Sequence, residues 1–243
     1  MPKVILDLCG GSGAWSKPYK DAGYDVRLIN LPEYDVTNVA NVNDSLLFLH
    51  PYGGFMDVKY KDIYGILAAP PCTEFSLAKN GNHRKRDLQT GMETVEACMQ
   101  IIWAVQIHTK LSFWALENPV GLLRRFLGKP QYSFYQWWFG DKGIKRTDLW
   151  GCFNIPKQTV FKRPDDPYYI KQYKSGKKNQ FAWSAPQKPE WYDGPKLDRA
   201  ALRAITPAGF AQAFFMANQL EKRRKIKLSR YYGKAEQICL TTN

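Results

Sequence analysis

The first thirty residues constrain the fold more than any other part of the chain. The apolar residues 4–8 predict a short buried strand, and the glycine-rich residues 9–14 follow it at once. A helix is expected over residues 15–22 and a second strand over residues 24–30. This order begins a doubly wound, nucleotide-binding sheet, in which glycine lets the backbone approach a ligand closely. A tight turn that binds nothing has the same composition, so the glycines alone leave the function open.

A cysteine stands at the end of the third predicted strand. Residues 63–69 are apolar and predict a buried strand, which Pro70 and Pro71 end because proline cannot continue a sheet ladder. Cys72 follows on this stiff turn. In open α/β sheets, ligand sites form at the carboxyl ends of strands, so we interpret Cys72 as a candidate reactive group. A buried structural thiol is the alternative.

A glutamate follows the end of the next predicted strand, as Cys72 follows the end of its strand. Residues 111–116 predict another buried strand, and Glu117-Asn118-Pro119 follows it, facing the same crevice as Cys72. A simple turn is the alternative. Between the two strands lies a basic stretch, residues 79–87, either a phosphate-contacting loop or a solvated one. A long amphipathic helix is expected after it, over residues 88–108, with one packing stripe: Met92, Val95, Met99 and Ile102.

The remaining chain divides by composition. Residues 32–62 show no clear hydrophobic period and are expected to be irregular with one helix. We expect a short helix over residues 122–127 and a strand over residues 144–151. We predict a catalytic and cofactor-binding domain over residues 1–151, a loop-rich insert over 152–198, a helix that returns to the catalytic domain over 199–220, and a basic tail over 221–243. Within the returning helix, Thr206 is expected to be a cap and Pro207 the first helical residue after it. Aromatic and basic residues alternate in the insert, which suits either nucleic-acid contact or a cover over the sheet.

Net charge and composition indicate which classes of partner the protein binds. The 243 residues include 35 Lys and Arg against 22 Asp and Glu, a net charge of +13, which favours a polyanion such as nucleic acid; a basic enzyme without one is the alternative. No apolar run is long enough to cross a bilayer, and no signal peptide is expected. Five scattered cysteines and three histidines give no metal-site spacing, so we expect no metal, reduced thiols and a cytoplasmic protein.

Five motifs in order resemble the cytosine carbon-5 DNA methyltransferases, especially their short phage-type members. They are a DLxxGxG-type loop at residues 7–13, PPCTEFS at 70–76, ENP at 117–119, KRT at 145–147 and TP at 206–207. The resemblance covers the chain to about Gln219. It implies a Rossmann-like α/β fold of the kind that depends on S-adenosylmethionine: a mostly parallel sheet flanked by helices, with a small insert across the cleft.

The resemblance also implies a chemistry. Cys72 matches the nucleophile that adds to carbon 6 of cytosine, so that carbon 5 can attack the methyl group of S-adenosylmethionine. Glu117 matches the acid at ring nitrogen 3. Arg146 matches the first arginine of a QxRxR-like segment, whose second arginine position is Asp148 here, and Lys145 or Arg146 covers for that contact. Asn30 stands where relatives usually have an acidic residue.

The remaining site residues follow from the same resemblance. Cofactor binding is expected of Leu8, Cys9, Gly11, Gly13, Trp15, Asn30, Asp35 and Pro70. Substrate binding is expected of Pro71, Ser76, Arg84, Lys85, Arg86, Asn118 and Lys145.

The expected function is thus methylation of cytosine carbon 5 in duplex DNA, with the base flipped out of the helix. The small insert predicts short or relaxed sequence specificity and salt-dependent binding through phosphates. Alternatives are the same chemistry on RNA or a free nucleotide, or a catalytically weak DNA-binding relative. A monomer is expected, and the short relatives suggest a phage origin.

Overall fold

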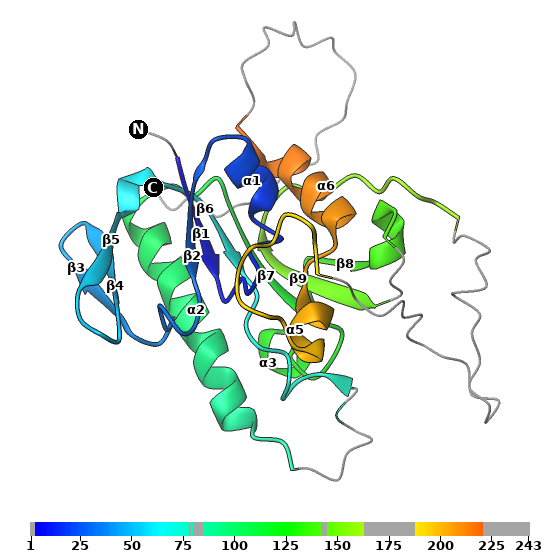
Figure 1. The fold of residues 1–243 in the computed structure, drawn as a ribbon, viewed down its shortest axis with the longest axis horizontal. Coiled ribbons are helices and arrows are strands. Elements are labelled where there is room, and N and C mark those ends of the chain that lie inside the picture. The colour runs from blue at the N-terminus through cyan, green and yellow to red at the C-terminus, as the bar shows by residue number, and fades with distance from the viewer. Residues whose placement is uncertain (1–2, 78, 80–84, 142–144, 163–187, 221–243) are drawn as a thin grey trace, which may run out of the picture.

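A six-stranded sheet forms the centre of the molecule (Figure 1). The computed structural model describes residues 3–77, 79, 85–141, 145–162 and 188–220. The strand order is β2-β1-β6-β7-β9-β8; β9 runs antiparallel to both of its neighbours, and the other five strands run in one direction. The bounds are β1 Val4–Leu8, β2 Asp25–Ile29, β6 Ile63–Ala68, β7 Phe113–Pro119, β8 Tyr132–Tyr135 and β9 Arg146–Cys152. The predicted α/β architecture with a mostly parallel sheet is therefore present.

Helices cover both faces of this sheet. The helix α2 spans Leu88–His108, as predicted, and packs on one face with Val95 and Ile102 buried and Met92 and Met99 partly buried. The helices α1 (Lys17–Asp21) and α6 (Ala208–Asn218) pack on the opposite face, where aromatic rings fill the core. Shorter helical turns are η1 Tyr60–Asp62, α3 Arg124–Leu127, η3 Gln136–Phe139 and α5 Arg199–Ala204.

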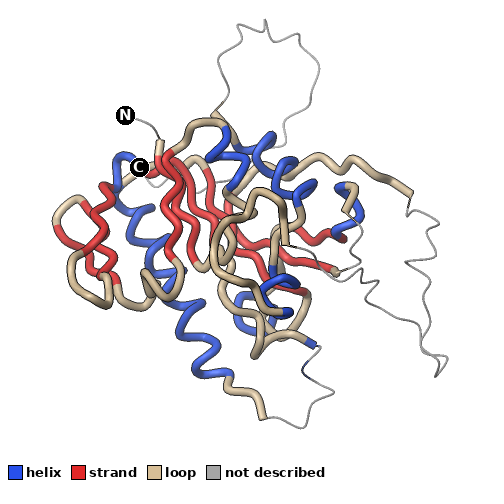
Figure 2. Tube along the Cα trace, viewed as in Figure 1, coloured by secondary structure: helices blue, strands red, loops and turns tan. Residues whose placement is uncertain are grey.

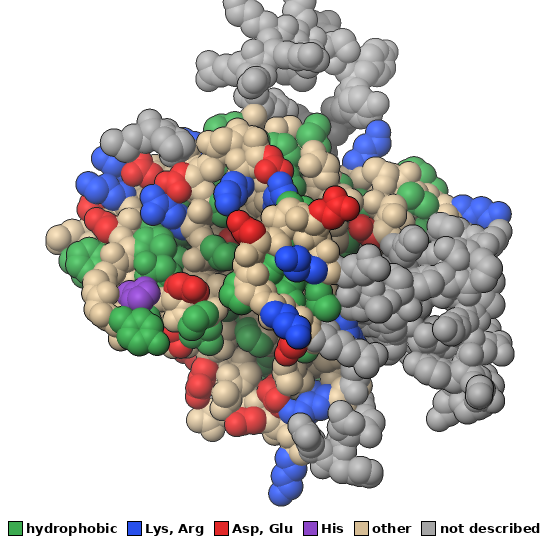
Figure 3. All heavy atoms as spheres, viewed as in Figure 1, with side chains coloured by type: hydrophobic (Ala, Val, Ile, Leu, Met, Phe, Trp, Pro, Cys, Tyr) green, Lys and Arg blue, Asp and Glu red, His purple; other side chains and the backbone are tan. Residues whose placement is uncertain are grey.

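Residues 32–62 were expected to be irregular with one helix, and that prediction is wrong. They contain a separate antiparallel sheet of three strands, β3 Val39–Val42, β4 Ser45–Leu49 and β5 Phe55–Lys59 (Figure 2). The first hairpin closes through two residues, and the first of them, Asn43, has a φ of 52°, which suits such a turn. Strands of four or five residues are too short to show a clear period in the sequence. Exposed hydrophobic side chains gather over this sheet at the left of Figure 3.

The C-terminal segment forms two helices, not the single helix that was predicted. Asp198 caps α5 by accepting a hydrogen bond from the Ala201 amide at 2.7 Å. The chain then leaves the helical conformation before Pro207, because proline disfavours a helical residue in front of it. Pro207 is consequently the cap of α6 and not its first helical residue.

Some predictions cannot be compared with the structure. Most of the predicted insert, residues 163–187, and the predicted basic tail, residues 221–243, lie outside the described residues. The cysteines can be compared in part: Cys9, Cys72 and Cys98 are free thiols, whereas Cys152 is disulfide-bonded, so the prediction of reduced thiols is wrong for that residue. In the described part of the chain, every helix is too short or too polar to cross a membrane.

Candidate active site

The turn that carries Cys72 lies directly beyond the end of β6. Pro70 is buried, Pro71 is exposed and Cys72 is partly exposed. The Cys72 carbonyl accepts hydrogen bonds from the amides of Phe75 at 3.0 Å and Ser76 at 2.8 Å, which closes the turn. The thiol is thus presented from a rigid, hydrogen-bonded turn at the carboxyl edge of the sheet.

Phe75 anchors this turn to the segment that follows β7. Its ring is fully buried, and its carbonyl accepts a hydrogen bond from the Leu122 amide at 2.9 Å. A Cβ atom on Gly121 would lie 2.3 Å from that carbonyl oxygen, so only glycine allows the two backbones to approach this closely.

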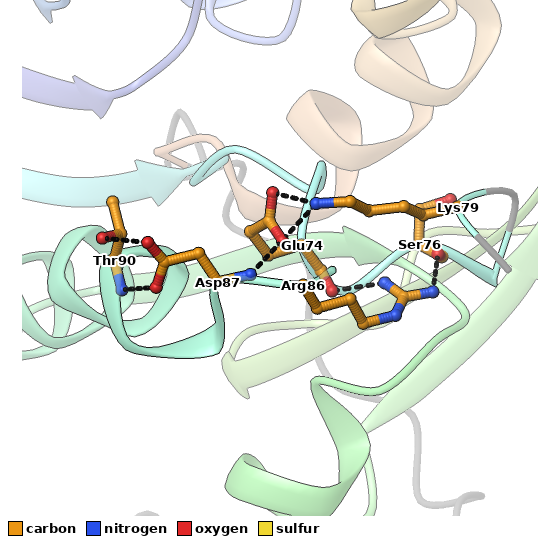
Figure 4. Close-up of polar contacts among 6 residues, drawn as sticks. All are labelled: Glu74, Ser76, Lys79, Arg86, Asp87 and Thr90. Atoms are coloured by element: carbon orange, nitrogen blue, oxygen red, sulfur yellow. Dashed lines mark hydrogen bonds and ion pairs between the residues drawn. The ribbon is translucent and has the colours of Figure 1, made fainter. Parts of the chain in front are cut away.

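Glu74 anchors the same turn to the start of α2 (Figure 4). Its carboxylate accepts hydrogen bonds from the Lys79 ammonium and, at 2.7 Å, from the Asp87 amide. The guanidinium of Arg86 donates to the carbonyls of Glu74 at 2.5 Å and Ser76 at 2.9 Å. Arg86, predicted to bind substrate, therefore helps to build the wall of the site. Its neighbour Lys85 is exposed, and Arg84 lies outside the described residues.

Glu117 lies within β7, although the sequence predicted a strand that stops before it. The strand continues to Pro119 because β9 pairs with it, with Glu117 opposite Leu149. The parallel pairing of β6 with β7 ends at Ala68 and Leu116, so Glu117 is the next residue at the edge where the Cys72 turn begins.

An ammonium group lies beside this acid. Lys145 Nζ is 3.9 Å from Glu117 Oε1, and the two side chains are only 21% and 18% exposed. Burial raises the pKa of Glu117; the nearby charge of Lys145 lowers that pKa, and the charge of Asp148 raises it. Burial also raises the pKa of the Cys72 thiol, which Lys145 lowers, Glu117 raises and Arg203 lowers. The structure thus brings together a thiol, a carboxyl and an ammonium group.

Arg146 does not join this group. Successive residues of a strand point to opposite faces, and the guanidinium of Arg146 lies 5.7 Å from the centre of the Tyr135 ring. Asp148, two residues along on the same side, is fully buried and accepts two hydrogen bonds from Arg124, each of 2.6 Å. The sequence did not indicate Arg124 or Arg203, since only the tertiary fold brings them to these neighbours.

Asn118 connects the two halves of the site. Its side-chain amide donates a hydrogen bond of 3.0 Å to the Pro70 carbonyl, and both residues are buried. One amide therefore ties the strand that carries Glu117 to the turn that carries Cys72.

The glycine-rich loop lies at the same edge, beyond β1. Leu8 is fully buried, and the Cys9 amide donates to the Ile29 carbonyl at 2.8 Å. Cys9, Gly11 and Gly13 have φ values of 57°, 56° and 73°. A Cβ on Gly11 would meet no atom within 4 Å, so the outer side of this loop is open for a ligand to approach the backbone.

Asp7 lies beneath this loop and was not among the predicted site residues. The carboxyl is fully buried and accepts a hydrogen bond from Ser16 Oγ at 2.5 Å, while its Oδ1 atom has no partner among the described residues. Burial raises the pKa of Asp7 to about 7, although the Ser16 hydrogen bond lowers it. The signal in the sequence was a single acid inside an otherwise apolar strand.

The other predicted cofactor residues differ in their placement. Trp15 is only 1% exposed, and its ring packs on Phe210 and Phe214 of α6, so its side chain belongs to the core and does not face the loop surface. Asn30 and Asp35 are both partly exposed and follow β2. Asn30 donates to the Leu31 carbonyl at 2.9 Å, and Asp35 Oδ1 accepts hydrogen bonds from the amide and hydroxyl of Thr37.

Comparisons with known proteins give a limited result. No family model matches the chain. A stretch of 136 residues is 26% identical to the Type II methyltransferase M.DdeI of Desulfomicrobium norvegicum; it covers 53% of this chain and 30% of that protein. The chain thus spans less than a third of the relative's length, and the likeness supports a relationship to a methyltransferase. Within the described residues, no three His, Cys, Asp or Glu side chains are grouped to hold a metal ion.

Proposed function

We propose that this protein methylates carbon 5 of cytosine in DNA, with S-adenosylmethionine as the methyl donor. The observation that carries the proposal is the meeting of Cys72, Glu117 and Lys145 at the carboxyl edge of the sheet, beside an open glycine-rich loop. The partial likeness to a Type II methyltransferase supports methyl transfer as the reaction class.

The chemistry follows from what each side chain can do. The Cys72 thiolate adds to carbon 6 of the ring and forms a carbon–sulfur bond, while ring nitrogen 3 takes a proton from Glu117. Electron density then reaches carbon 5, which becomes a nucleophile. S-adenosylmethionine, when bound, supplies a methyl group activated by a positively charged sulfur. A base or water then takes the carbon-5 proton, the Cys72 sulfur departs, and the nitrogen-3 proton returns to Glu117, which restores the aromatic ring.

The electrostatics of the site suit the acid. Burial raises the pKa of Glu117, which favours the protonated carboxyl that the donation to the ring requires. The same burial opposes ionisation of Cys72, and the positive charges of Lys145 and Arg203 counteract it. In this proposal Lys145 stabilises the thiolate before the attack.

The residues of the glycine-rich loop fit the cofactor. Gly11 and Gly13 turn the backbone through the left-handed region and leave its outer side open to the methionine and ribose groups. Asp7 lies buried beneath Gly10 and would support the loop from below. Leu8, Cys9 and Pro70 would line the site, and Asn30 and Asp35 would accept hydrogen bonds from the ribose and adenine.

DNA is the proposed substrate because of charge and chemistry together. A net charge of +13 favours a polyanion, and a cytosine inside a duplex must be flipped out before Cys72 can reach carbon 6. Pro71, Ser76, Lys85 and Asn118 would border the flipped base or its phosphates. Short or relaxed specificity follows from the small size of the predicted insert.

Transfer of tritiated methyl groups tests this proposal. Unmethylated duplex DNA, single-stranded DNA, RNA and free cytidine nucleotides are each incubated with the native protein, with Cys72→Ser and with the matched thiol variant Cys98→Ser. Cys98 is buried in the core. We expect label in 5-methylcytosine of DNA for the native and Cys98→Ser proteins and none for Cys72→Ser.

Three other outcomes would contradict parts of the proposal. Transfer by Cys72→Ser would refute the covalent mechanism. Label confined to RNA or to nucleotides would refute DNA as the substrate. Label in adenine or at another position of cytosine would refute carbon 5 as the acceptor.

A further inference from the structure

The segment from Val120 to Gly140, which forms α3, β8 and η3, combines basic and aromatic side chains and contains no Asp or Glu. All its residues are described. Its cations are Arg124, Arg125 and Lys129, and its aromatic residues are Phe126, Tyr132, Phe134, Tyr135, Trp137, Trp138 and Phe139. Interleaved basic and aromatic residues were noted in the sequence of the predicted insert, but the described structure places such a set here, outside the insert.

The aromatic residues of this segment divide between the core and the surface. Phe134 and Phe139 are buried against Phe210 of α6. Tyr135 and Trp137 are only partly buried, and their rings are stacked with centroids 6.3 Å apart. Tyr135 ends β8, the last strand in the sheet order, and Trp137 lies in η3 directly after it.

Arg146 lies over one ring of this pair, that of Tyr135. Its guanidinium is exposed and 5.7 Å from the centre of the Tyr135 ring, and in the described part of the chain it has no hydrogen bond or ion pair. Arg124 differs, because its guanidinium donates two hydrogen bonds to the buried Asp148 and one to the Ser133 hydroxyl. Arg125 and Lys129 of the same segment are exposed, as Arg146 is, and no ion pair of these three side chains is found among the described residues.

This surface is continuous with the candidate active site. The Val120 amide donates to the Arg146 carbonyl at 3.0 Å, and Val120 is three residues beyond Glu117. On the other side, the ring of Phe126 lies 6.1 Å from that of Phe75, in the turn that carries Cys72. A strand held here would pass the mouth of the site.

We propose that this α3–β8 surface, made of Arg125, Lys129, Tyr135, Trp137 and Arg146, binds the DNA strand that flanks the target cytosine. The cations contact phosphates, and the Tyr135–Trp137 pair stacks on a base exposed when the target is flipped. Charge complementarity favours a polyanion, and exposed aromatic rings among cations favour one that carries unstacked bases. The inference rests on the proposed function and adds to it a binding surface outside the predicted insert.

Fluorescence anisotropy with a labelled DNA oligonucleotide, duplex and single-stranded, tests the surface at several salt concentrations. The variants are Arg146→Gln and Tyr135→Leu, and the matched control is Arg27→Gln, which removes the same charge from β2 at the opposite edge of the sheet. We expect each surface variant to weaken binding by about fivefold or more at low salt. Arg146→Gln should also reduce the slope of log affinity against log salt by about 1.

The outcomes separate this inference from the proposed function. If native protein binds DNA and Arg146→Gln binds as tightly as Arg27→Gln, the surface is refuted while the proposed function stands. If native protein binds neither form of DNA, both are refuted. Circular dichroism and the rate of Cys72 alkylation check that the variants are folded, since neither should change.

Discussion

Replacing Asp7 by asparagine would reveal how the buried carboxyl under the glycine-rich loop affects stability. Asp7 is fully buried, and burial raises its pKa from 3.8 to about 7. Asparagine has nearly the same shape, can still accept the hydrogen bond from Ser16, and carries no charge at any pH. The substitution therefore removes the titration and keeps the packing.

The sign and size of the effect follow from the two pKa values. Between pH 4 and pH 7 the folded protein holds a proton on Asp7 that the unfolded chain has already lost, so the free energy of unfolding falls as the pH rises. Each pKa unit corresponds to about 1.4 kcal/mol. From pH 5 to pH 8, where about two units of the window are crossed, the loss from this group is about 3 kcal/mol.

Urea unfolding of the native protein and of Asp7→Asn at pH 5 and pH 8 measures this loss. We expect the native protein to lose about 3 kcal/mol more stability between the two pH values than the variant does. Asp57→Asn, at an exposed position of β5, is the control and should behave as the native protein does. An equal pH dependence in the native protein and in Asp7→Asn would refute the reasoning from burial.

Two further predictions concern the site itself. Lys145→Gln should move the pH profile of Cys72 alkylation by iodoacetamide to higher pH, because a charge that lowers the thiol pKa is lost. Arg146→Gln should leave that profile unchanged, and coincident profiles for the two variants would contradict the assignment of Lys145. Asn118→Ala leaves the buried Pro70 carbonyl without its donor and should lower the free energy of unfolding by about 1 to 3 kcal/mol. Urea unfolding measures this loss, with Asn38→Ala at an exposed position as the control; equal stability of the two variants would argue against that hydrogen bond.

Much of the central sheet could be predicted because its strands are buried on both faces. Residues 63–68 form a continuous apolar run, and residues 4–8 are apolar except for Asp7; such runs predict buried strands. The helix α2 was equally clear, since its stripe from Met92 to Ile102 extends over about three turns and Asp87 marks its beginning. The strands β3, β4, β5 and β8 were missed; β3, β5 and β8 mix polar with apolar residues over only four or five positions, which gives neither a continuous apolar run nor a clear period.

The candidate site divides in the same way. The positions of Cys72 and Glu117 at strand ends could be predicted, because proline ends a strand locally and parallel strands end at one edge. The sequence could not show which cation lies beside Cys72 and Glu117. Lys145 and Arg146 are adjacent in the sequence, and their side chains point to opposite sides of the sheet. The burial of Trp15 was also missed, because α6, which covers it, lies almost two hundred residues further along the chain.

The sequence by itself determined the layers of the fold and the chemical groups at the sheet edge, because both depend on local patterns of apolar residues, glycine and proline. Only the tertiary structure decided the electrostatics of those groups. The raised pKa of Asp7, the ammonium beside Glu117 and the neutralisation of Asp148 by Arg124 all depend on burial and on distances of a few ångströms between residues far apart in the chain. Coulomb energy and desolvation vary steeply over such distances, so no local pattern in the sequence can specify them.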